Sequence, residues 1–272
     1  MGLESWLRSP AGRYLLAWEH AQLDLALVDC FGFHALQLGL PSFDALRANR
    51  MPHRWVAHDG NETSPAADGH GSGGPVDDDV LRMLPSVGLR CDFSALPFPS
   101  QSLDLVVLPH TLERSRDPHD TLREVERVLV PEGRVVIVGF NPASLWGLRQ
   151  RLGHARRRVG SHAPLLMPDE GEFIGYWRLR DWLRLLGLEA EVGRFGRWRW
   201  PFSSERALQR MAWLERAGER WWPVFGALYF VVAVKRVRGM RMVGLARQQA
   251  PRPRAAPAAV AQSHLHSQEE KV

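Results

Sequence analysis

The segment from residue 102 to residue 140 contains two apolar runs separated by one amphipathic stretch, and this pattern constrains the fold more than any other feature. Ser102 to Leu108 is short and mostly apolar, with two adjacent valines, which is typical of a buried strand. Asp117-Pro118 supplies an N-cap and a first-turn proline, and one face of the following helix of about 13 residues carries Leu122, Val125, Val128 and Leu129. Pro131 to Gly133 is predicted to end this helix, and Arg134 to Phe140 is a second buried strand.

A strand, a helix and a second strand in this order form a βαβ unit with parallel strands and a right-handed crossover. The sequence therefore predicts an α/β fold with helices on both faces of the sheet. Further predicted elements are a helix from Ser9 to Leu27, a helix from Leu179 to Leu188 ended by glycine, and strands at Glu189–Gly193 and Ala227–Lys235.

Composition limits the class of protein. The chain has 272 residues, 45% of them apolar, which suffices for a substantial core and excludes wholesale disorder. Its two cysteines, Cys30 and Cys91, cannot build a disulfide scaffold or a cysteine-rich zinc site, so we expect a reduced, cytoplasmic protein without a metal centre. Charged residues interrupt the N-terminus, which argues against an export signal, and the longest apolar run, Val224 to Val234, is too short to cross a bilayer.

Four regions are expected along the chain. Residues 1–30 form an N-terminal helical segment, and residues 31–145 form the core, with a flexible loop at residues 60–79 that holds five acidic residues and no Lys or Arg. Residues 146–240 form a basic lid or insertion followed by the helix and strands that complete the sheet. Residues 241–272 are too poor in apolar side chains to fold and are expected to be a disordered tail.

The stretch from Arg90 to Ile137, RCDFSALPFPSQSLDLVVLPHTLERSRDPHDTLREVERVLVPEGRVVI, carries a family resemblance. It resembles the central part of a class I S-adenosylmethionine-dependent methyltransferase of the type-11 domain group. The residues that carry the likeness are Asp92, the Leu96-Pro97-Phe98 turn, Asp104 and the Arg-Val-Leu-x-Pro-x-Gly end of the helix. Phe31 to His34 and Phe140 to Pro142 are similar to an uncharacterised bacterial branch of that group. The resemblance implies a Rossmann-like seven-stranded sheet, S-adenosylmethionine as cofactor and methyl transfer, without a substrate.

The resemblance also implies a set of cofactor-binding positions. The glycine-rich loop after the first strand falls at Leu36 to Phe43, where only Gly39 remains of three glycines and Gln37 replaces the usual carboxylate. The Gln37 amide oxygen can accept a hydrogen bond from the cofactor's ammonium group. Asp59 lies at the distance expected for the acid that binds the ribose, and it can equally begin the acidic loop. Asp92 is expected beside the adenine amino group with Phe93 on the ring, or as a turn cap, and Pro109 ends the fourth strand in the same pocket.

His110 follows the fourth strand and is the candidate general base, because its ordinary pKa of about 6.5 suits proton transfer at neutral pH. The alternatives are that it contacts the cofactor or caps the next helix; Glu113 and Asn141 are weaker candidates. The chain lacks the Asn/Asp-Pro-Pro-aromatic motif of adenine methylases and the Pro-Cys nucleophile of cytosine C5 enzymes, so nucleic acid is an unfavoured substrate. We expect a small-molecule or lipid-like acceptor. The alternative function, prompted by the altered loop, is a non-catalytic module that has kept the fold as a binding or scaffold protein.

The net charge of +5 has a definite location. Residues 149–158 hold five arginines and no acid, which equals the net charge of the whole chain. Arg197 to Trp200 alternates arginine with tryptophan, and Trp221-Trp222 follows. These groups could stack bases or contact an anionic membrane surface, or they could form a lid or edge hairpin with inward tryptophans and solvated arginines. Oligomeric state is not indicated.

Overall fold

The fold is built on a seven-stranded sheet with the strand order β3-β2-β1-β4-β5-β7-β6. The computed structural model describes residues 2–59, 87–158, 167–168, 171–200 and 205–236. The strands are β1 (His34–Leu38), β2 (His53–Asp59), β3 (Val87–Cys91), β4 (Leu103–Pro109), β5 (Leu129–Phe140), β6 (Leu188–Gly196) and β7 (Leu228–Lys235). Strands β1 to β5 pair in parallel, whereas β7 runs antiparallel to both β5 and β6. The predicted Rossmann-like seven-stranded sheet is confirmed.

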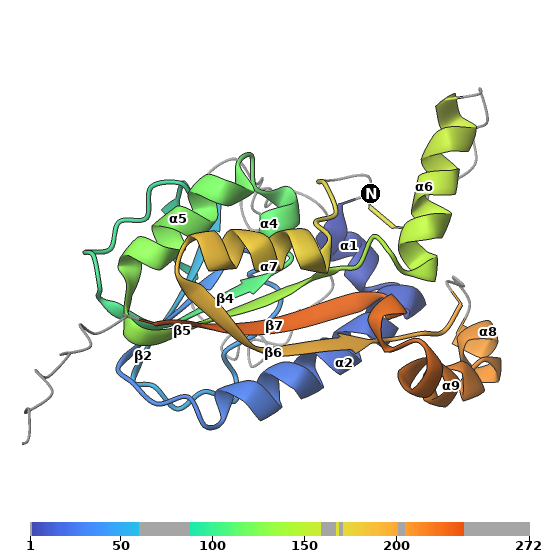
Figure 1. The fold of residues 1–272 in the computed structure, drawn as a ribbon, viewed down its shortest axis with the longest axis horizontal. Helices are drawn as coiled ribbons and strands as arrows, with labels where there is room; N and C mark the ends of the chain where they lie inside the picture. The colour runs from blue at the N-terminus through green and yellow to red at the C-terminus, as the bar shows by residue number, and fades with distance from the viewer. Residues whose placement is uncertain (1, 60–86, 159–166, 169–170, 201–204, 237–272) are drawn as a thin grey trace, which may run out of the picture. The chain divides into compact units, whose positions relative to one another are not determined.

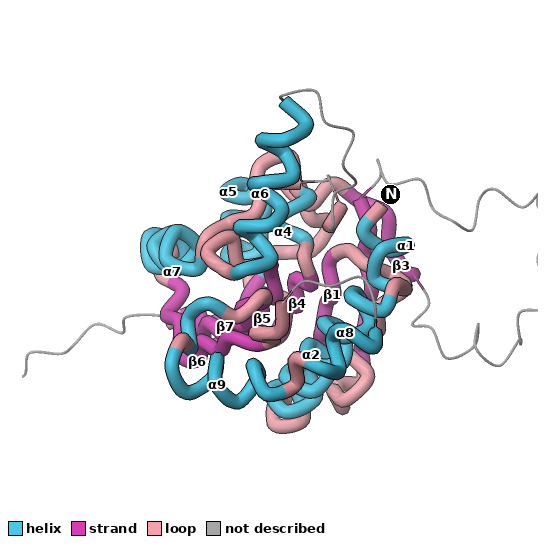
Figure 2. The backbone as a smooth tube through the Cα atoms, turned by 90° about the vertical axis from the view of Figure 1, so that its right-hand side faces the viewer, coloured by secondary structure: helices cyan, strands magenta, loops and turns pink. Residues whose placement is uncertain are grey.

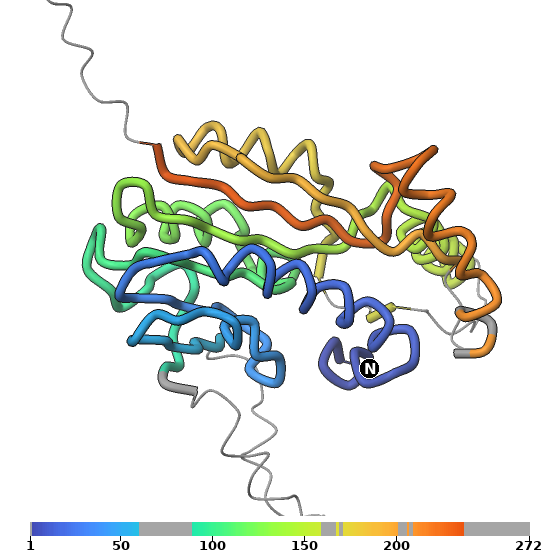
Figure 3. Tube along the Cα trace, turned by 90° about the horizontal axis from the view of Figure 1, so that it is seen from below, coloured from blue at the N-terminus to red at the C-terminus, as the bar shows by residue number. Residues whose placement is uncertain are grey.

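Helices cover both faces of the sheet (Figure 1). Helices α4 (Thr111–Arg114), α5 (Pro118–Val128) and α7 (Tyr176–Leu185) pack on one face, and α1 (Leu3–Leu7) and α2 (Pro10–Leu27) pack on the other. Figure 3 shows α2 lying along the underside of the sheet. Alternating strand residues separate the two cores: Val135 and Ile137 face α5 and α7, whereas Val136 and Val138 face α2. Helices α6 (Leu145–Arg158), α8 (Glu205–Arg210) and α9 (Trp213–Trp221) and the 3-10 helix η1 (Pro223–Phe225) gather at the carboxyl end of β5 (Figure 2).

The βαβ unit forms as predicted, with one correction at the end of its helix. Asp117 caps α5 by accepting hydrogen bonds from the backbone N–H groups of His119 and Asp120. The helix ends at Val128, and Leu129, predicted on its apolar face, already belongs to β5 and pairs with Leu103. The segment 131–133 lies inside β5 instead of forming a separate stop, and Glu132 there has a φ of +63°. The chain therefore passes from helix to sheet without a loop.

The remaining predicted elements also occur, with shifted ends. Ser9 caps α2 by accepting a hydrogen bond from the N–H of Gly12, as the Ser-Pro signal indicated. Helix α7 begins and ends three residues before its predicted bounds, and Gly187, with a φ of +75°, follows it. Both Cys30 and Cys91 are free thiols. The predicted loop at residues 60–79 and the predicted tail at residues 241–272 lie outside the described residues.

Two features of the fold bear on the location of a site. Strands β1 and β4 are neighbours, and the chain winds away from them in opposite directions, so the crevice of this doubly wound sheet lies at their carboxyl ends. In addition, no helix within the described ranges combines the length and the apolar character needed to cross a bilayer.

Candidate functional site

The predicted cofactor residues lie along one edge of the sheet. Asp92 follows β3, Asp59 ends β2, Gly39 follows β1 and Pro109 ends β4, and these four strands are consecutive in the sheet. Asp59 is paired with Cys91, the residue that precedes Asp92, so the two carboxylates belong to neighbouring strand ends. The sheet therefore brings the four positions to the edge where ligands of such folds bind.

Gly39 is required by its backbone and its surroundings. Its φ of +79° lies in the left-handed region that favours glycine. Its N–H donates to the Ala57 carbonyl oxygen over 2.7 Å, which ties the loop to β2. A Cβ at this position would lie 3.2 Å from the Thr111 Oγ1 and 3.9 Å from the Phe93 ring. Gly39, Phe93 and Thr111 thus come together at the crevice, although Thr111 was not singled out from the sequence.

Gln37 organises the loop after β1 from within. Its side chain is fully buried, and its Nε2 donates to the carbonyl oxygens of Gly39, Leu40 and Phe43 at 3.1, 3.0 and 2.7 Å. Its Oε1 accepts from the N–H of Ala45 at 3.0 Å. The amide oxygen that was expected to meet the cofactor's ammonium group is therefore directed at the protein's own backbone. In this arrangement the amide works as a donor toward carbonyl oxygens, a task that a carboxylate cannot perform.

The two acids differ in their surroundings. Asp92 is exposed, and its Oδ1 accepts hydrogen bonds from the backbone N–H and the hydroxyl of Ser94, which lower the pKa of the carboxyl and keep it ionised. Asp92 therefore does cap the turn that follows β3. Asp59 is half-buried at the end of β2. Between them, burial and then the charges of Asp92 and Asp59 raise the pKa of the Cys91 thiol to about 11.

His110 is buried between two carboxylates. It follows β4 with a φ of +54° and is 1% exposed. Its Nε2 lies 3.1 Å from Glu19 Oε1 on α2, and its Nδ1 lies 3.1 Å from Glu113 Oε2 on α4. Burial alone would lower the pKa of His110, but Glu19 and Glu113 outweigh it and raise the pKa to about 10. An imidazolium bonded at both nitrogens cannot accept a proton, so this geometry favours a structural role over that of general base.

The partners of His110 were mostly missed from the sequence. Glu113 was a weak catalytic candidate; its Oε1 accepts from the Phe140 N–H, and burial raises the pKa of its carboxyl. Glu19 has a recognisable signal, because it occupies the apolar stripe of α2 four residues from both Leu15 and Leu23. Burial and then Glu113 raise the pKa of the Tyr229 hydroxyl beside this cluster. The Glu19 Oε2 and the Tyr229 hydroxyl have no hydrogen-bond partner within the described structure.

Asn141, the other catalytic candidate, joins β5 to η1. Its Nδ2 donates to the carbonyl oxygens of Val224 and Gly226 at 2.8 and 2.9 Å, and its Oδ1 accepts from the N–H of Ala143. All three contacts are to the backbone, and the residue is 3% exposed. The side chain therefore positions the chain after β5 instead of facing a ligand.

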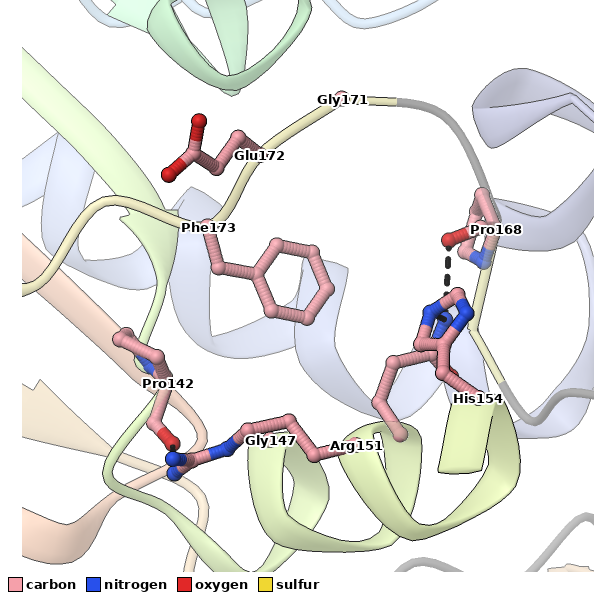
Figure 4. A pocket seen from close by; sticks show the side chains of 9 residues that line it. Pro142, Gly147, Arg151, His154, Pro168, Gly171, Glu172 and Phe173 are labelled. Atoms are coloured by element: carbon pink, nitrogen blue, oxygen red, sulfur yellow. Dashed lines mark hydrogen bonds between the residues drawn. The ribbon is translucent and has the colours of Figure 1, made fainter. Parts of the chain in front are cut away.

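A pocket of about 240 Å³ lies between α6 and the chain around Phe173 (Figure 4). Phe173 packs on Phe140, which in turn contacts the His110 ring at a centroid distance of 4.2 Å. Arg151 and His154 line the α6 side of the pocket, and Figure 4 shows them opposite Phe173. Phe173 and Phe140 thus lie between the pocket and His110, which follows β4.

The alternating arginines and tryptophans have mixed environments. Arg197 and Arg199 lie over the Tyr14 ring and pair with Glu215, so they are not solvated as one of the alternatives supposed. Trp198 is half-buried against Gly218, with its Nε1 donating to the Trp222 carbonyl oxygen. No group of three His, Cys, Asp or Glu side chains suited to a metal ion occurs in the described ranges.

Comparison with known proteins supports the same fold. Residues 77–137 match the family model described as "Methyltransferase domain". The uncharacterised protein YafS of Escherichia coli K12 is 34% identical over 151 residues, which are 55% of each chain. The malonyl-[acyl-carrier protein] O-methyltransferase of Halorhodospira halophila is 41% identical over 63 residues, 22% of this chain and 21% of that one. The matches span about half, or less, of the length of these curated relatives.

Solved structures agree in fold at low identity. YcgJ of Bacillus subtilis has a TM-score of 0.50 and 16% identity, covering 81% of this chain and 99% of its own. A chain of the complex that contains the Haloferax volcanii Trm112 methyltransferase activator has a TM-score of 0.50 and 18% identity, covering 87% and 97%. The protein therefore has the Rossmann-like fold typical of methyltransferases, and residues 77–137 match the model of the methyltransferase domain.

Proposed function

We propose that this protein binds S-adenosylmethionine at the carboxyl edge of β1 to β4 and transfers its methyl group to a small-molecule or lipid-like acceptor. The observation that carries the proposal is the convergence of Gly39, Asp59 and Asp92 on consecutive strand ends beside the β1/β4 crevice. The matched methyltransferase segment includes β3, β4 and α5, which supply part of this edge.

The chain's own residues fit parts of the cofactor. The half-buried Asp59 would bind the ribose hydroxyls, and the ionised Asp92 would bind the adenine amino group. The buried Phe93 forms a wall of the crevice, and Gly39 lets the backbone approach without a Cβ. Gln37 does not fit the ammonium group in the observed arrangement. The cofactor, when bound, supplies an electrophilic methyl group on a sulfonium, and the protein's task in such a displacement is chiefly positioning.

The pocket beside Phe173 is the proposed acceptor site. It adjoins the end of β5, one strand beyond His110, and Phe140 and Phe173 fill the space between them. Gln150, Arg151 and His154 give its α6 side polar groups, Glu172 adds a carboxylate beside Phe173, and Phe173 and two prolines are apolar. This lining suits an acceptor with a polar end and an apolar body. We assign no general base, because both nitrogens of His110 are bonded to carboxylates.

Calorimetric titration tests the cofactor assignment. The full chain is titrated with S-adenosylmethionine and with its demethylated product. Asp92→Asn should bind about tenfold to a hundredfold more weakly, since it loses a charge-assisted hydrogen bond. Asp181→Asn, the same change at an exposed position on α7, is the matched control and should bind normally. Equal affinity in Asp92→Asn and the wild type would contradict the assignment.

A scaffold function is the second candidate, because the Gln37 amide is used within its own loop. Circular dichroism of the samples used for the titration shows whether the chain is folded, and the two measurements together separate the two functions. A folded chain that releases no heat at cofactor concentrations up to several hundred micromolar, roughly the upper range of functional affinities, would favour the scaffold. If binding occurs, transfer of labelled methyl groups into organic-soluble or water-soluble fractions then distinguishes a lipid-like acceptor from a polar one.

A further inference from the structure

Helix α6 has an apolar face that the described protein leaves uncovered. Trp146, Gly147 and Gln150 turn inward and are buried. Leu145, Leu148 and Leu152, which we call the outer leucine face, follow at i, i+3 and i+7 and lie on the opposite side. Leu148 is 48% exposed and Leu152 is 52% exposed. The far half of α6 projects from the body in Figure 1. Three leucines of one helix therefore point into solvent together.

Positive charge borders this leucine face. Five arginines and no acidic residue occur between Leu145 and Arg158, and all five are exposed. At 100° per residue, Arg149 and Arg156 fall along one border of the outer leucine face, and Arg151 and Arg158 fall toward the other. Cationic side chains beside an apolar stripe complement a surface whose outer layer is anionic and whose interior is apolar.

A second exposed apolar group lies at the same end of the molecule. Trp221, Trp222, Val224 and Phe225, at the end of α9 and in η1, are all exposed, Trp221 by 71%. Asn141, three residues before Ser144 at the start of α6, holds the carbonyl oxygens of Val224 and Gly226. Trp146 of α6 donates to the Arg199 carbonyl oxygen from the same region. Figure 2 looks onto this end and shows α6 and α9 above and below the sheet's carboxyl edge.

We propose that this end of the molecule, formed by α6 and the α9–η1 turn, docks on the surface of an anionic lipid bilayer. Leucines of an interfacial helix enter the acyl boundary, tryptophans favour the headgroup level, and arginine heads reach anionic phosphates from apolar stems. Each basic side chain near an anionic leaflet adds attraction that salt screens. The charge of α6 argues for this occupant over a second copy of the chain, whose α6 would bring the same five positive charges.

The inference goes beyond the proposed methyl transfer, because neither α6 nor η1 contributes a cofactor residue. It also gives the proposed lipid-like acceptor a route, since the docking end is the carboxyl end of the parallel strands, where the crevice and the Phe173 pocket lie. Cofactor titration and membrane binding can fail independently of each other.

Vesicle co-sedimentation of the full chain tests the proposal. Vesicles of phosphatidylcholine alone are compared with vesicles that also contain phosphatidylglycerol. Binding is expected only with the anionic lipid, and it should fall by at least about tenfold between roughly 0.05 M and roughly 0.5 M NaCl. Leu148→Ser with Leu152→Ser should weaken binding about tenfold, because two half-exposed leucines no longer enter the bilayer. Arg156→Gln with Arg158→Gln should weaken it and reduce its salt dependence.

The control is Leu25→Ser on α2, a leucine 63% exposed at the opposite end of the strands, which should bind like the wild type. All these positions are exposed, so the variants should fold, and circular dichroism checks this. The proposal is overturned if the wild type does not sediment with anionic vesicles, or if the leucine pair binds as well as the wild type. A dimer in gel filtration that the leucine pair abolishes, without vesicle binding, would identify a second copy as the occupant and likewise overturn it.

Discussion

Gln37→Glu separates the two roles open to this residue. As a cofactor ligand, a carboxylate here would pair with the ammonium group and strengthen binding. As the organiser of the loop after β1, the amide is needed for its N–H donors. The substitution preserves the shape of the side chain and removes both donors, while the carbonyl oxygens of Gly39, Leu40 and Phe43 stay where they are.

The expected cost follows from those contacts. The two N–H groups of Gln37, shared among three carbonyl oxygens, contribute about 1 kcal/mol each. The three buried oxygens then face a carboxyl group, so we expect a total cost of about 3–5 kcal/mol. That is a large share of the roughly 5–15 kcal/mol by which most domains are stable. The cost should increase with pH. Burial raises the pKa of the new carboxyl in the folded state, so the folded chain keeps its proton and one O–H donor while the unfolded chain ionises above its ordinary pKa of about 4.3. The variant therefore loses stability as pH rises from that value toward the raised folded pKa.

Urea unfolding, followed by tryptophan fluorescence at about pH 5.5 and about pH 8, measures this effect. Gln22→Glu is the matched control, since Gln22 already accepts a hydrogen bond from Arg194 on the surface, and it should leave stability within about 0.5 kcal/mol of the wild type. If Gln37→Glu unfolded at the wild-type midpoint and bound S-adenosylmethionine more tightly, the structural role assigned to the amide would be refuted.

Three further perturbations test the surroundings of the site. His110→Gln leaves the Glu19 and Glu113 carboxylates buried without a cation and should lower the free energy of unfolding, measured in urea, by about 3–5 kcal/mol. Because the folded-state pKa of His110, about 10, exceeds its ordinary value of about 6.5, the wild type should lose stability as pH rises between those values. An equally steep loss in the variant would contradict the pairing. Gly39→Ala should lower the free energy of unfolding by about 1–2 kcal/mol and weaken cofactor binding, because the φ of residue 39 is +79° and a Cβ there would crowd Thr111. Unchanged unfolding and titration curves would show that the loop can rearrange. Asn141→Ala removes three backbone contacts and should cost about 2 kcal/mol without changing cofactor affinity, and a selective loss of affinity would return Asn141 to the site.

Local sequence signals predicted the fold well. Apolar runs, the Asp117-Pro118 cap and the Ser-Pro start of α2 depend on neighbouring residues, and the structure contains all of these elements. The predicted boundaries were wrong where pairing with a distant strand decides whether a residue joins a helix or a strand. Leu129 continues the helical apolar spacing, but its pairing with Leu103 places it in β5. Exposed faces were also hard to assign, since the arginines at 197 and 199, expected in one alternative to be solvated, stack on Tyr14 from a distant helix.

The sequence by itself determined the α/β class, the βαβ unit and the concentration of positive charge in residues 149–158, which follow from periodicity, turn chemistry and charge acting over a few residues. The family resemblance supplied the placement of Gly39, Asp59 and Asp92 at strand ends. Only the tertiary structure decided that Gln37 serves its own loop, that His110 lies between Glu19 and Glu113, and that the described part of the chain leaves the outer leucine face of α6 exposed. Those outcomes depend on contacts between residues up to 91 positions apart, and the side chain that satisfies a buried donor or acceptor is fixed only when the chain has folded.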